Sequence, residues 1–418
     1  MATDLSKYNI HAGTAMFTLM LSVFVDVIGY SMILPLLPGI AKTFGASDIV
    51  VGILISSNAF TALIFGPIWG KLSDKYGRKP ILVVSQAGTL AAFLVLGISD
   101  SLAIIFFSRI LDGMFGGQYP VIRAYITDIT TPKTRSSEIG KITVGMALGM
   151  ILGPLIGGFL GALNWRYPAF LASVMALISI ILTLRVLVES MPKERRDDIE
   201  KILKAEGAIN KKITINKEVS IRFIQLFLAF SITVMFNSSL PLVIDKRYSA
   251  GPETIGLIMG IGGTAAIFYG GFLLKRMIKK FGEKRIYLFT FAMVTILFLI
   301  YPFLYEIWMV YIFIIPFAFC MASMNPLITS NITKAVEENK QGVVSGWSTN
   351  IQSISQTISP LISTGYLQLS FLVIFSITLD SYQLIGFTAA FLGILLIVIA
   401  FYDVQKHSYL YEHENDDE

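Results

Sequence analysis

Twelve long apolar stretches separated by short polar segments make up most of the chain of 418 residues. A helix needs about 20 apolar residues to cross a bilayer. We therefore predict transmembrane helices near residues 14–38, 49–69, 81–98, 102–125, 139–162, 168–188, 221–244, 254–274, 286–304, 308–332, 342–369 and 383–402. Alternating segments of about ten residues, which would indicate a membrane β-barrel, do not appear. The pattern predicts an all-α polytopic membrane protein.

A charged segment at 189–219 divides these spans six plus six. The predicted domains are an N-terminal bundle at 1–188, a cytoplasmic linker at 189–219 with one amphipathic helix, a C-terminal bundle at 220–403 and a tail at 404–418. The two halves resemble each other, because an apolar helix, a glycine-rich end and a basic turn follow in the same order in both. Such internal duplication is typical of transporters whose two bundles rock about a site at the midplane.

Composition agrees with a membrane protein, since 54% of the residues are hydrophobic, 15% are charged and the mean hydropathy is +0.69. If both termini are cytoplasmic, the external loops hold only Lys42, Arg166, Lys246 and Arg247. The positive-inside rule then accounts for the net charge of +5 without a nucleic-acid partner. We expect a multi-pass protein of the plasma membrane with both termini inside, working as a monomer.

Residues typical of enzymes and metal sites are sparse. The three histidines, His11, His407 and His413, lie near the chain ends, and the single cysteine, Cys320, lies in an apolar run. No nucleophile–base grouping or metal-ligand cluster appears. We therefore expect no enzyme activity, no cofactor and no metal.

The polar turn between the second and third predicted helices, GKLSDKYGRKP at 70–80, holds five charges between two apolar spans. It resembles the signature loop of the major facilitator superfamily, and the residues that fit are Gly70, Leu72, Asp74, Gly77, Arg78 and Lys79. The resemblance implies a fold of twelve helices in two pseudo-symmetric bundles.

Three further segments narrow the resemblance. The first helix carries DVIGYSMILPLLP (26–38), the fourth RILDGMFGG (109–117) and the fifth GMALGMILGPLIGG (145–158). Together they are similar to motifs of tetracycline/proton antiporters and multidrug efflux relatives. This implies proton-coupled export of a small lipophilic or drug-like molecule by alternating access.

Charges near the membrane midplane are costly and are functional candidates by default. In the predicted spans these are Asp26, Arg109 and Asp112. Burial disfavours the charged form of a carboxylate, which allows Asp26 to exchange a proton near physiological pH. The resemblance implies that all three take part in proton coupling. The alternative is a structural role, with Asp26 permanently paired to an arginine, or with Arg109 and Asp112 paired within one helix.

A gating role is expected for the signature loop, through Gly70, Asp74, Gly77, Arg78 and Asp128. Arg78 is placed to pair with Asp128, which ends the fourth helix. Asp74 is expected to meet a partner in the facing domain, such as a helix N-terminus. The alternative, a set of positive-inside anchors, explains the lysines of the loop but not Asp74.

Glycines recur at every fourth position of the fifth helix and form a stripe suited to close backbone contact, at Gly145, Gly149, Gly153, Gly157 and Gly161. Pro154 and Gly158 belong to the antiporter-like motif of the same helix, and Pro154 is expected to bend it. Such a stripe suits a helix that slides against the other domain, although generic tight packing needs the same glycines. Polar side chains at membrane depth give candidates for the substrate cavity, namely Tyr30, Asn58, Gln118, Asn237, Asn325 and Asn350.

One departure from the antiporters limits the substrate. The tetracycline antiporters carry further acids in the third and ninth helices, where this chain has Ala92 and Met293. Tetracycline–metal complexes are therefore doubtful substrates. The alternatives to drug export are an importer or facilitator of a sugar or other metabolite, and a receptor or scaffold that does not transport.

Overall fold

The computed structural model describes residues 12–198, 217–337, 341–369, 371–374, 377–407 and 411. Apolar stretches fold as helices, because a bilayer cannot hydrogen-bond an exposed backbone. The first half contains α1 (Ala12–Ile33), α2 (Leu37–Thr43), α3 (Asp48–Tyr76), α4 (Arg78–Gly97), α5 (Leu102–Phe115), α6 (Tyr119–Ile129), α7 (Pro132–Leu163) and α8 (Tyr167–Val186).

The second half continues with α10 (Lys217–Tyr248), α11 (Pro252–Phe268), a π-helical turn η2 (Tyr269–Leu273), α12 (Leu274–Phe281), α13 (Glu283–Ile300) and a 3₁₀ turn η3 (Tyr301–Phe303). It ends with α14 (Ile307–Lys334), α15 (Gln341–Gln368), the strands β1 (Phe371–Ile374) and β2 (Ile377–Asp380), and α16 (Ser381–Lys406). The helical part of the expected linker is seen at 193–198, and residues 199–216 lie outside the described part.

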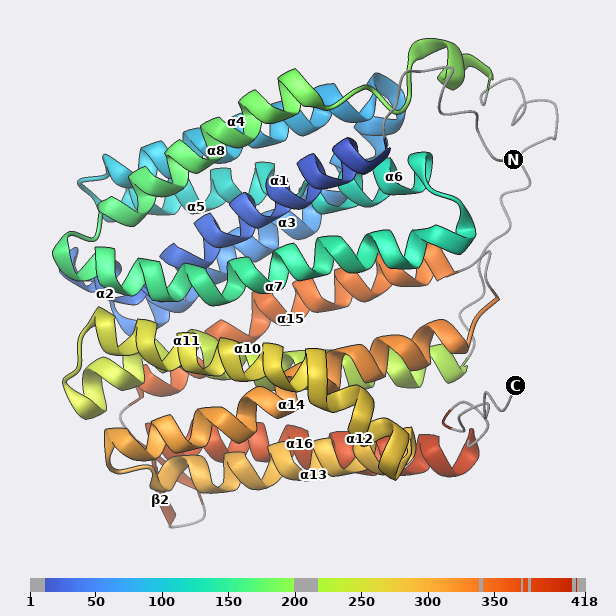
Figure 1. Cartoon of the computed structure of the whole chain (residues 1–418). Coiled ribbons are helices and arrows are strands. Elements are labelled where there is room, and N and C mark those ends of the chain that lie inside the picture. Colours follow the sequence, from blue (N-terminus) through green and yellow to red (C-terminus); the bar gives the residue numbers. More distant parts are fainter. Residues whose placement is uncertain are drawn as a thin grey trace. The chain divides into compact units, whose positions relative to one another are not determined.

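The described residues form two compact units. One comprises those within 1–36 and 57–212, and the other comprises those within 37–56 and 213–418. In each unit the long helices run side by side (Figure 1). Helix α2 and the first turns of α3 thus group with the C-terminal half of the chain.

Most predicted spans appear as single helices. Within the described residues, ten helices are long and apolar enough to cross a membrane. The other two predicted spans correspond to α5 with α6, and to α15, which is rich in serine, threonine and glutamine. The all-α membrane fold is therefore confirmed.

Two local features differ from the prediction. The span at 102–125 is broken, since α5 ends at Phe115 and α6 begins at Tyr119. In the loop before α16, β1 and β2 pair antiparallel, with Phe371 opposite Asp380, although no strand was expected. The β-branched and aromatic residues of this loop favour a strand.

The glycine stripe of α7 packs against α1 within the first unit, and sliding of α7 against the other domain stays a prediction. A Cβ on Gly149 would lie 3.0 Å from the Ile28 nitrogen, and one on Gly157 would lie 2.3 Å from the Met32 carbonyl oxygen. The Ser31 hydroxyl donates to the Gly149 carbonyl at 2.8 Å. Gly145 and Gly153 also meet α1, while Pro154 and Gly158 are buried in the same helix. The stripe thereby fixes the position of α1.

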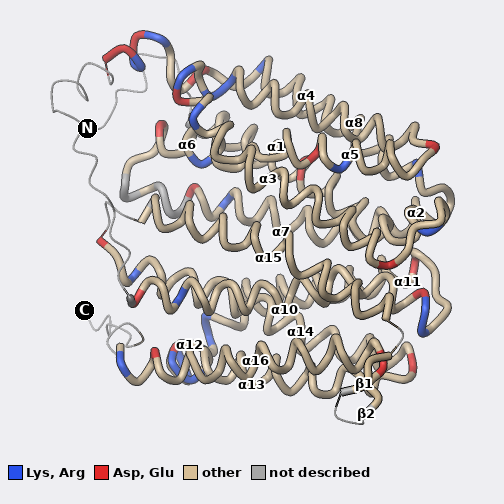
Figure 2. Tube along the Cα trace, turned by 180° about the vertical axis from the view of Figure 1, so that it is seen from behind, with Lys and Arg blue, Asp and Glu red and all other residues tan. Residues whose placement is uncertain are grey.

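Charged residues lie mostly at helix ends and in loops (Figure 2). Exceptions lie inside the first unit, where Arg109 and Asp112 are buried on α5. The interior of the first unit is therefore the candidate location of the functional site.

Candidate functional site

Asp26 lies near the middle of α1, on the helix that the glycine stripe of α7 supports. Its side chain is partly exposed, and so is that of Tyr30, which follows one helical turn later. Asp26 interacts electrostatically with Asp112, and Tyr30 interacts with both Asp112 and Arg109. These four residues of the sequence prediction thus form one cluster.

The break in the fourth span brings Gln118 to this cluster. Helix α5 stops before Gly116 and Gly117, and Gln118 forms the N-cap of α6. The Gln118 side chain hydrogen-bonds Asp26. Irregular backbone at membrane depth is tolerated where it is buried in protein or lines a cavity. The break is therefore a candidate part of the site.

Helix α4 holds the broken backbone in place. The Ser85 hydroxyl donates to the carbonyl oxygen of Phe115, the last residue of α5. The Phe115 ring lies directly on Gly88, where an added Cβ would be 2.0 Å from the ring. A side chain at position 88 would therefore displace the end of α5.

Arg109 and Asp112 form a buried ion pair. Arg109 Nη1 lies 3.3 Å from Asp112 Oδ2, and the two side chains are 1% and 5% exposed. Asn58 of α3 donates to the same carboxylate oxygen at 2.9 Å. Gly113 permits this contact, since a Cβ there would lie 2.2 Å from the Asn58 carbonyl oxygen. The pair expected within one helix is therefore shared with a second helix.

The charges of this cluster do not balance. It holds two carboxylates, on Asp26 and Asp112, and one guanidinium, on Arg109. With both carboxylates ionised, the group carries one negative charge in a region where unpaired charge is costly. A proton or a cationic group would neutralise it.

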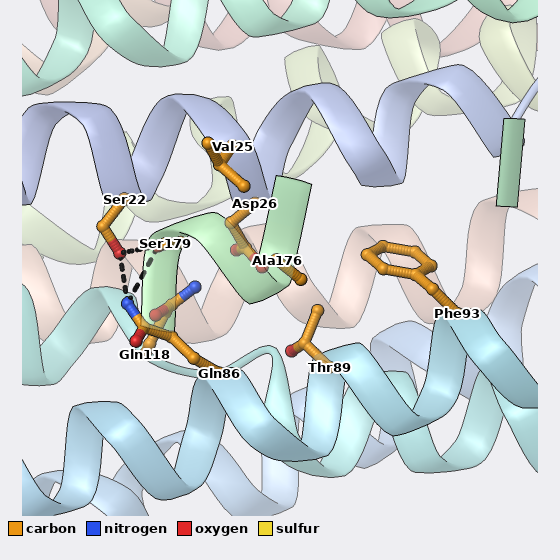
Figure 3. A pocket seen from close by; sticks show the side chains of 9 residues that line it. All are labelled: Ser22, Val25, Asp26, Gln86, Thr89, Phe93, Gln118, Ala176 and Ser179. Atoms are coloured by element: carbon orange, nitrogen blue, oxygen red, sulfur yellow. Dashed lines mark hydrogen bonds between the residues drawn. The ribbon is translucent and has the colours of Figure 1, made fainter. Parts of the chain in front are cut away.

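A small cavity lies beside Asp26, between α1, α4, α6 and α8 (Figure 3). Its polar lining includes Ser22, Gln86, Thr89, Gln118 and Ser179. Of these five residues, only Gln118 was predicted from the sequence. For Gln86 and Thr89 the signal was the segment SQAGT at 85–89, inside a span that is otherwise apolar.

The loop between α3 and α4 is held by Arg78. Its Nε lies 3.0 Å from Asp128 Oδ2, so the suggested pair is present. Its Nη1 lies 2.6 Å from Asp74 Oδ1 and donates to Ser73 Oγ at 2.7 Å. The Asp74 side chain is 65% exposed. Asp74 thus pairs with Arg78 within the same turn, and a partner of Asp74 in the facing domain stays a prediction.

Glu189, which sequence reasoning assigned to the linker, caps the start of α4. Its carboxylate accepts from the backbone nitrogens of Arg78 at 2.8 Å and Lys79 at 3.0 Å. Gly77 has a φ of 105°, and a Cβ there would lie 2.6 Å from Glu189 Oε2. A carboxylate at a helix N-terminus is stabilising, and glycine at position 77 leaves room for it. Gly70 lies in α3, about two turns before its end at Tyr76.

The remaining candidates of the substrate cavity lie in the second unit. Asn237 and Asn350 are partly exposed on α10 and α15, and Asn325 is exposed on α14. The Asn325 side-chain oxygen accepts from Gln352 at 3.3 Å. These residues stay predictions as substrate contacts. Among the described residues, no group of histidine, cysteine and acidic side chains could hold a metal ion.

Known proteins with similar sequences include proteins named for drug resistance. The chain is 29% identical over 361 residues to "Multidrug resistance protein 2" of Bacillus subtilis (strain 168), which covers 85% of this chain and 89% of the relative. It is 25% identical over 400 residues to "Tetracycline resistance protein, class H" of Pasteurella multocida, covering 93% and 96%.

A solved structure shares the fold. It is a bacterial homolog to the human lysosomal transporter Spinster, in an inward-facing and occupied conformation, with a TM-score of 0.74 at 12% identity over 96% of this chain and 98% of that one. A family model described as Major Facilitator Superfamily matches residues 19–360 and 276–409. The chain belongs to the Major Facilitator Superfamily.

Proposed function

We propose that this protein exports a small lipophilic or drug-like molecule in exchange for protons, by alternating access. The observation that carries the proposal is the charge imbalance in the first unit, where the carboxylates of Asp26 and Asp112 interact with each other and only Asp112 pairs with a guanidinium, that of Arg109. An excess carboxylate at membrane depth favours taking up one positive charge. That charge can be a proton or the cationic group of a substrate.

Competition between these two cations gives antiport. While Asp26 is protonated, the cluster is neutral and has little attraction for a cation. When the proton leaves, the restored negative charge attracts a positively charged or strongly polarised substrate. Because Arg109 and Asn58 already engage Asp112, Asp26 is the carboxylate that exchanges its proton.

The relatives support the same direction and chemistry, since their names describe resistance to several drugs or to tetracycline. Ala92, which stands where the tetracycline antiporters carry an acid, is fully buried on α4. We therefore favour lipophilic or cationic drugs over tetracycline–metal complexes as substrates.

The division of the sequence into two bundles joined by a linker suggests which parts move during transport. We propose that bundles 1–188 and 220–403 move against each other in a monomer of the plasma membrane, with both termini and the linker in the cytoplasm. No enzyme activity and no nucleic-acid partner belong to this proposal.

The loop between α3 and α4 would act as a gate at the cytoplasmic end of the substrate cavity. Asp74 is the exposed member of the Arg78 network, so it is free to exchange partners without unpacking the loop. We expect Asp74→Asn to reduce transport strongly while drug binding stays nearly unchanged. Equal losses of binding and transport would count against a gate.

The test is transport by protein reconstituted in liposomes with an acidic interior, followed with the lipophilic cation ethidium. We expect ethidium uptake that requires the pH gradient and is lost in Asp26→Asn. The matched control is Asp100→Asn, which changes an exposed acid of the same unit. Ethidium equilibration that ignores the gradient would indicate a facilitator, and binding without movement by folded protein would indicate a receptor.

A further inference from the structure

The cavity beside Asp26 contains polar atoms that the protein leaves without partners. Among the described residues, Gln86 Oε1, Thr89 Oγ1 and Gln118 Oε1 are buried and accept or donate no hydrogen bond. The three side chains are 2% to 3% exposed and line the same cavity as Asp26 (Figure 3). A buried polar group without a partner costs about 1–3 kcal/mol, so three in one place point to a bound ligand.

Gln86 is held so that one end of its amide faces the cavity. The other end, Nε2, lies 2.6 Å from Ser22 Oγ on α1, 3.1 Å from Ser179 Oγ and 3.0 Å from Thr183 Oγ1, both on α8. If the amide is turned by 180°, these hydroxyls donate to its oxygen and the NH₂ group faces the cavity. In either orientation one end of Gln86 has no protein partner.

The size of the cavity limits what it can hold. Its volume is about 10 Å³, close to the least space in which one water molecule fits. Buried waters usually make about three hydrogen bonds to polar groups that lack other partners. Asp26, Gln86, Thr89 and Gln118 supply four polar groups, which is enough for one water, while the walls at Val25 and Phe93 are apolar.

We propose that this cavity is a binding site for one ordered water molecule, which hydrogen-bonds the Asp26 carboxyl group together with Gln86 and Thr89. Gln86, Thr89 and Gln118 are then positioning residues of the proton step. In that step the O–H bond of the Asp26 carboxyl breaks, its electron pair stays on Asp26, and the proton passes to the water as hydronium. This last role rests on the proposed proton coupling, whereas the water site itself does not.

The first test is a structure of the wild-type protein at a resolution that shows ordered waters. We expect density within hydrogen-bond distance of Asp26, Gln86 and Thr89. A map that shows other buried waters but none at this site would overturn the proposal, whatever the protein transports.

The second test uses infrared spectra of the Asp26 carboxyl band, identified by its loss in Asp26→Asn. Thr89→Val keeps the shape of the side chain and removes the hydroxyl that holds the water, so we expect the band to move to higher wavenumber. The control, Thr18→Val, removes a hydroxyl of α1 that donates to the Thr14 carbonyl oxygen of the same helix, and should leave the band in place. An unmoved band in Thr89→Val would refute the positioning role.

The outcomes of the two proposals are separable. If no carboxyl band depends on Asp26, then the proton role of Asp26 fails, and the density map still decides whether the water site exists. If Thr89→Val does not fold, the wild-type map decides the question alone.

Discussion

Replacing Gly157 by alanine tests how strictly α7 fixes α1. A Cβ at this position would lie 2.3 Å from the Met32 carbonyl oxygen and 2.8 Å from the Met32 Cα. Both are backbone atoms, so no side-chain rotation can relieve the contact. Restoring a separation of about 3.5 Å requires the α1 backbone to move by roughly 1 Å.

This displacement of α1 is expected to lower both the stability and the transport activity of the protein. Overpacking of a tight interior costs about 1–3 kcal/mol, which should lower the Tm of the purified protein. Asp26 lies on the same helix, six residues before Met32, so its distance to Gln118 changes as well. We expect proton-driven ethidium transport to fall by about tenfold or more, since small misplacements of reacting groups have effects of that size.

Gly140→Ala is the matched control on the same helix, because a Cβ there meets nothing within 4 Å. Alanine has a higher helix propensity than glycine by about 1 kcal/mol, so the Tm of this variant should be unchanged or higher.

Gly153→Ala gives a second comparison, since its Cβ would lie 1.8 Å from Ser31 Oγ. We expect a second substitution, Ser31→Gly, to restore part of the Tm that Gly153→Ala loses. A Gly157→Ala protein with wild-type Tm and transport would show that the contact at Gly157 does not fix the position of α1.

Three further substitutions test individual contacts of charged side chains. Arg222→Met should destabilise the second unit by about 3–5 kcal/mol, because Asp403 loses a partner at 3.0 Å while both side chains are fully buried; an unchanged Tm would show that the ion pair is dispensable. Glu189→Gln should lower the Tm by removing a charged cap of α4, at a cost of about 0.5–2 kcal/mol, and a higher Tm would contradict the capping role. Lys246→Met should lower the Tm, because it takes one of two lysine partners from the buried Asp48; a stability equal to wild type would argue against that contact.

The apolar pattern predicted the fold well because the bilayer permits few alternatives to a long apolar helix. Hydropathy alone did not reveal the break before Gln118, since α5 and α6 are both apolar enough to extend a span. The local signal was present in Gly116-Gly117 and in Pro120, which disfavour a continuous helix.

The site was only partly predictable from the sequence. Asp26, Arg109 and Asp112 were found because charge at membrane depth is rare. Gln86 was missed because one amide in an apolar span is not costly enough to draw attention, and its importance depends on hydroxyls from two other helices. Glu189 was missed for a related reason, since its capping contact joins residues far apart in the sequence.

Proton release on substrate binding tests directly whether Asp26 exchanges a proton for substrate. Ethidium is added to purified protein in weakly buffered solution, and pH is followed with a soluble dye. We expect ethidium to release protons from the wild-type protein and from Asp100→Asn, and to release none from Asp26→Asn. Proton release of wild-type size from Asp26→Asn, in protein that still binds ethidium, would contradict this exchange.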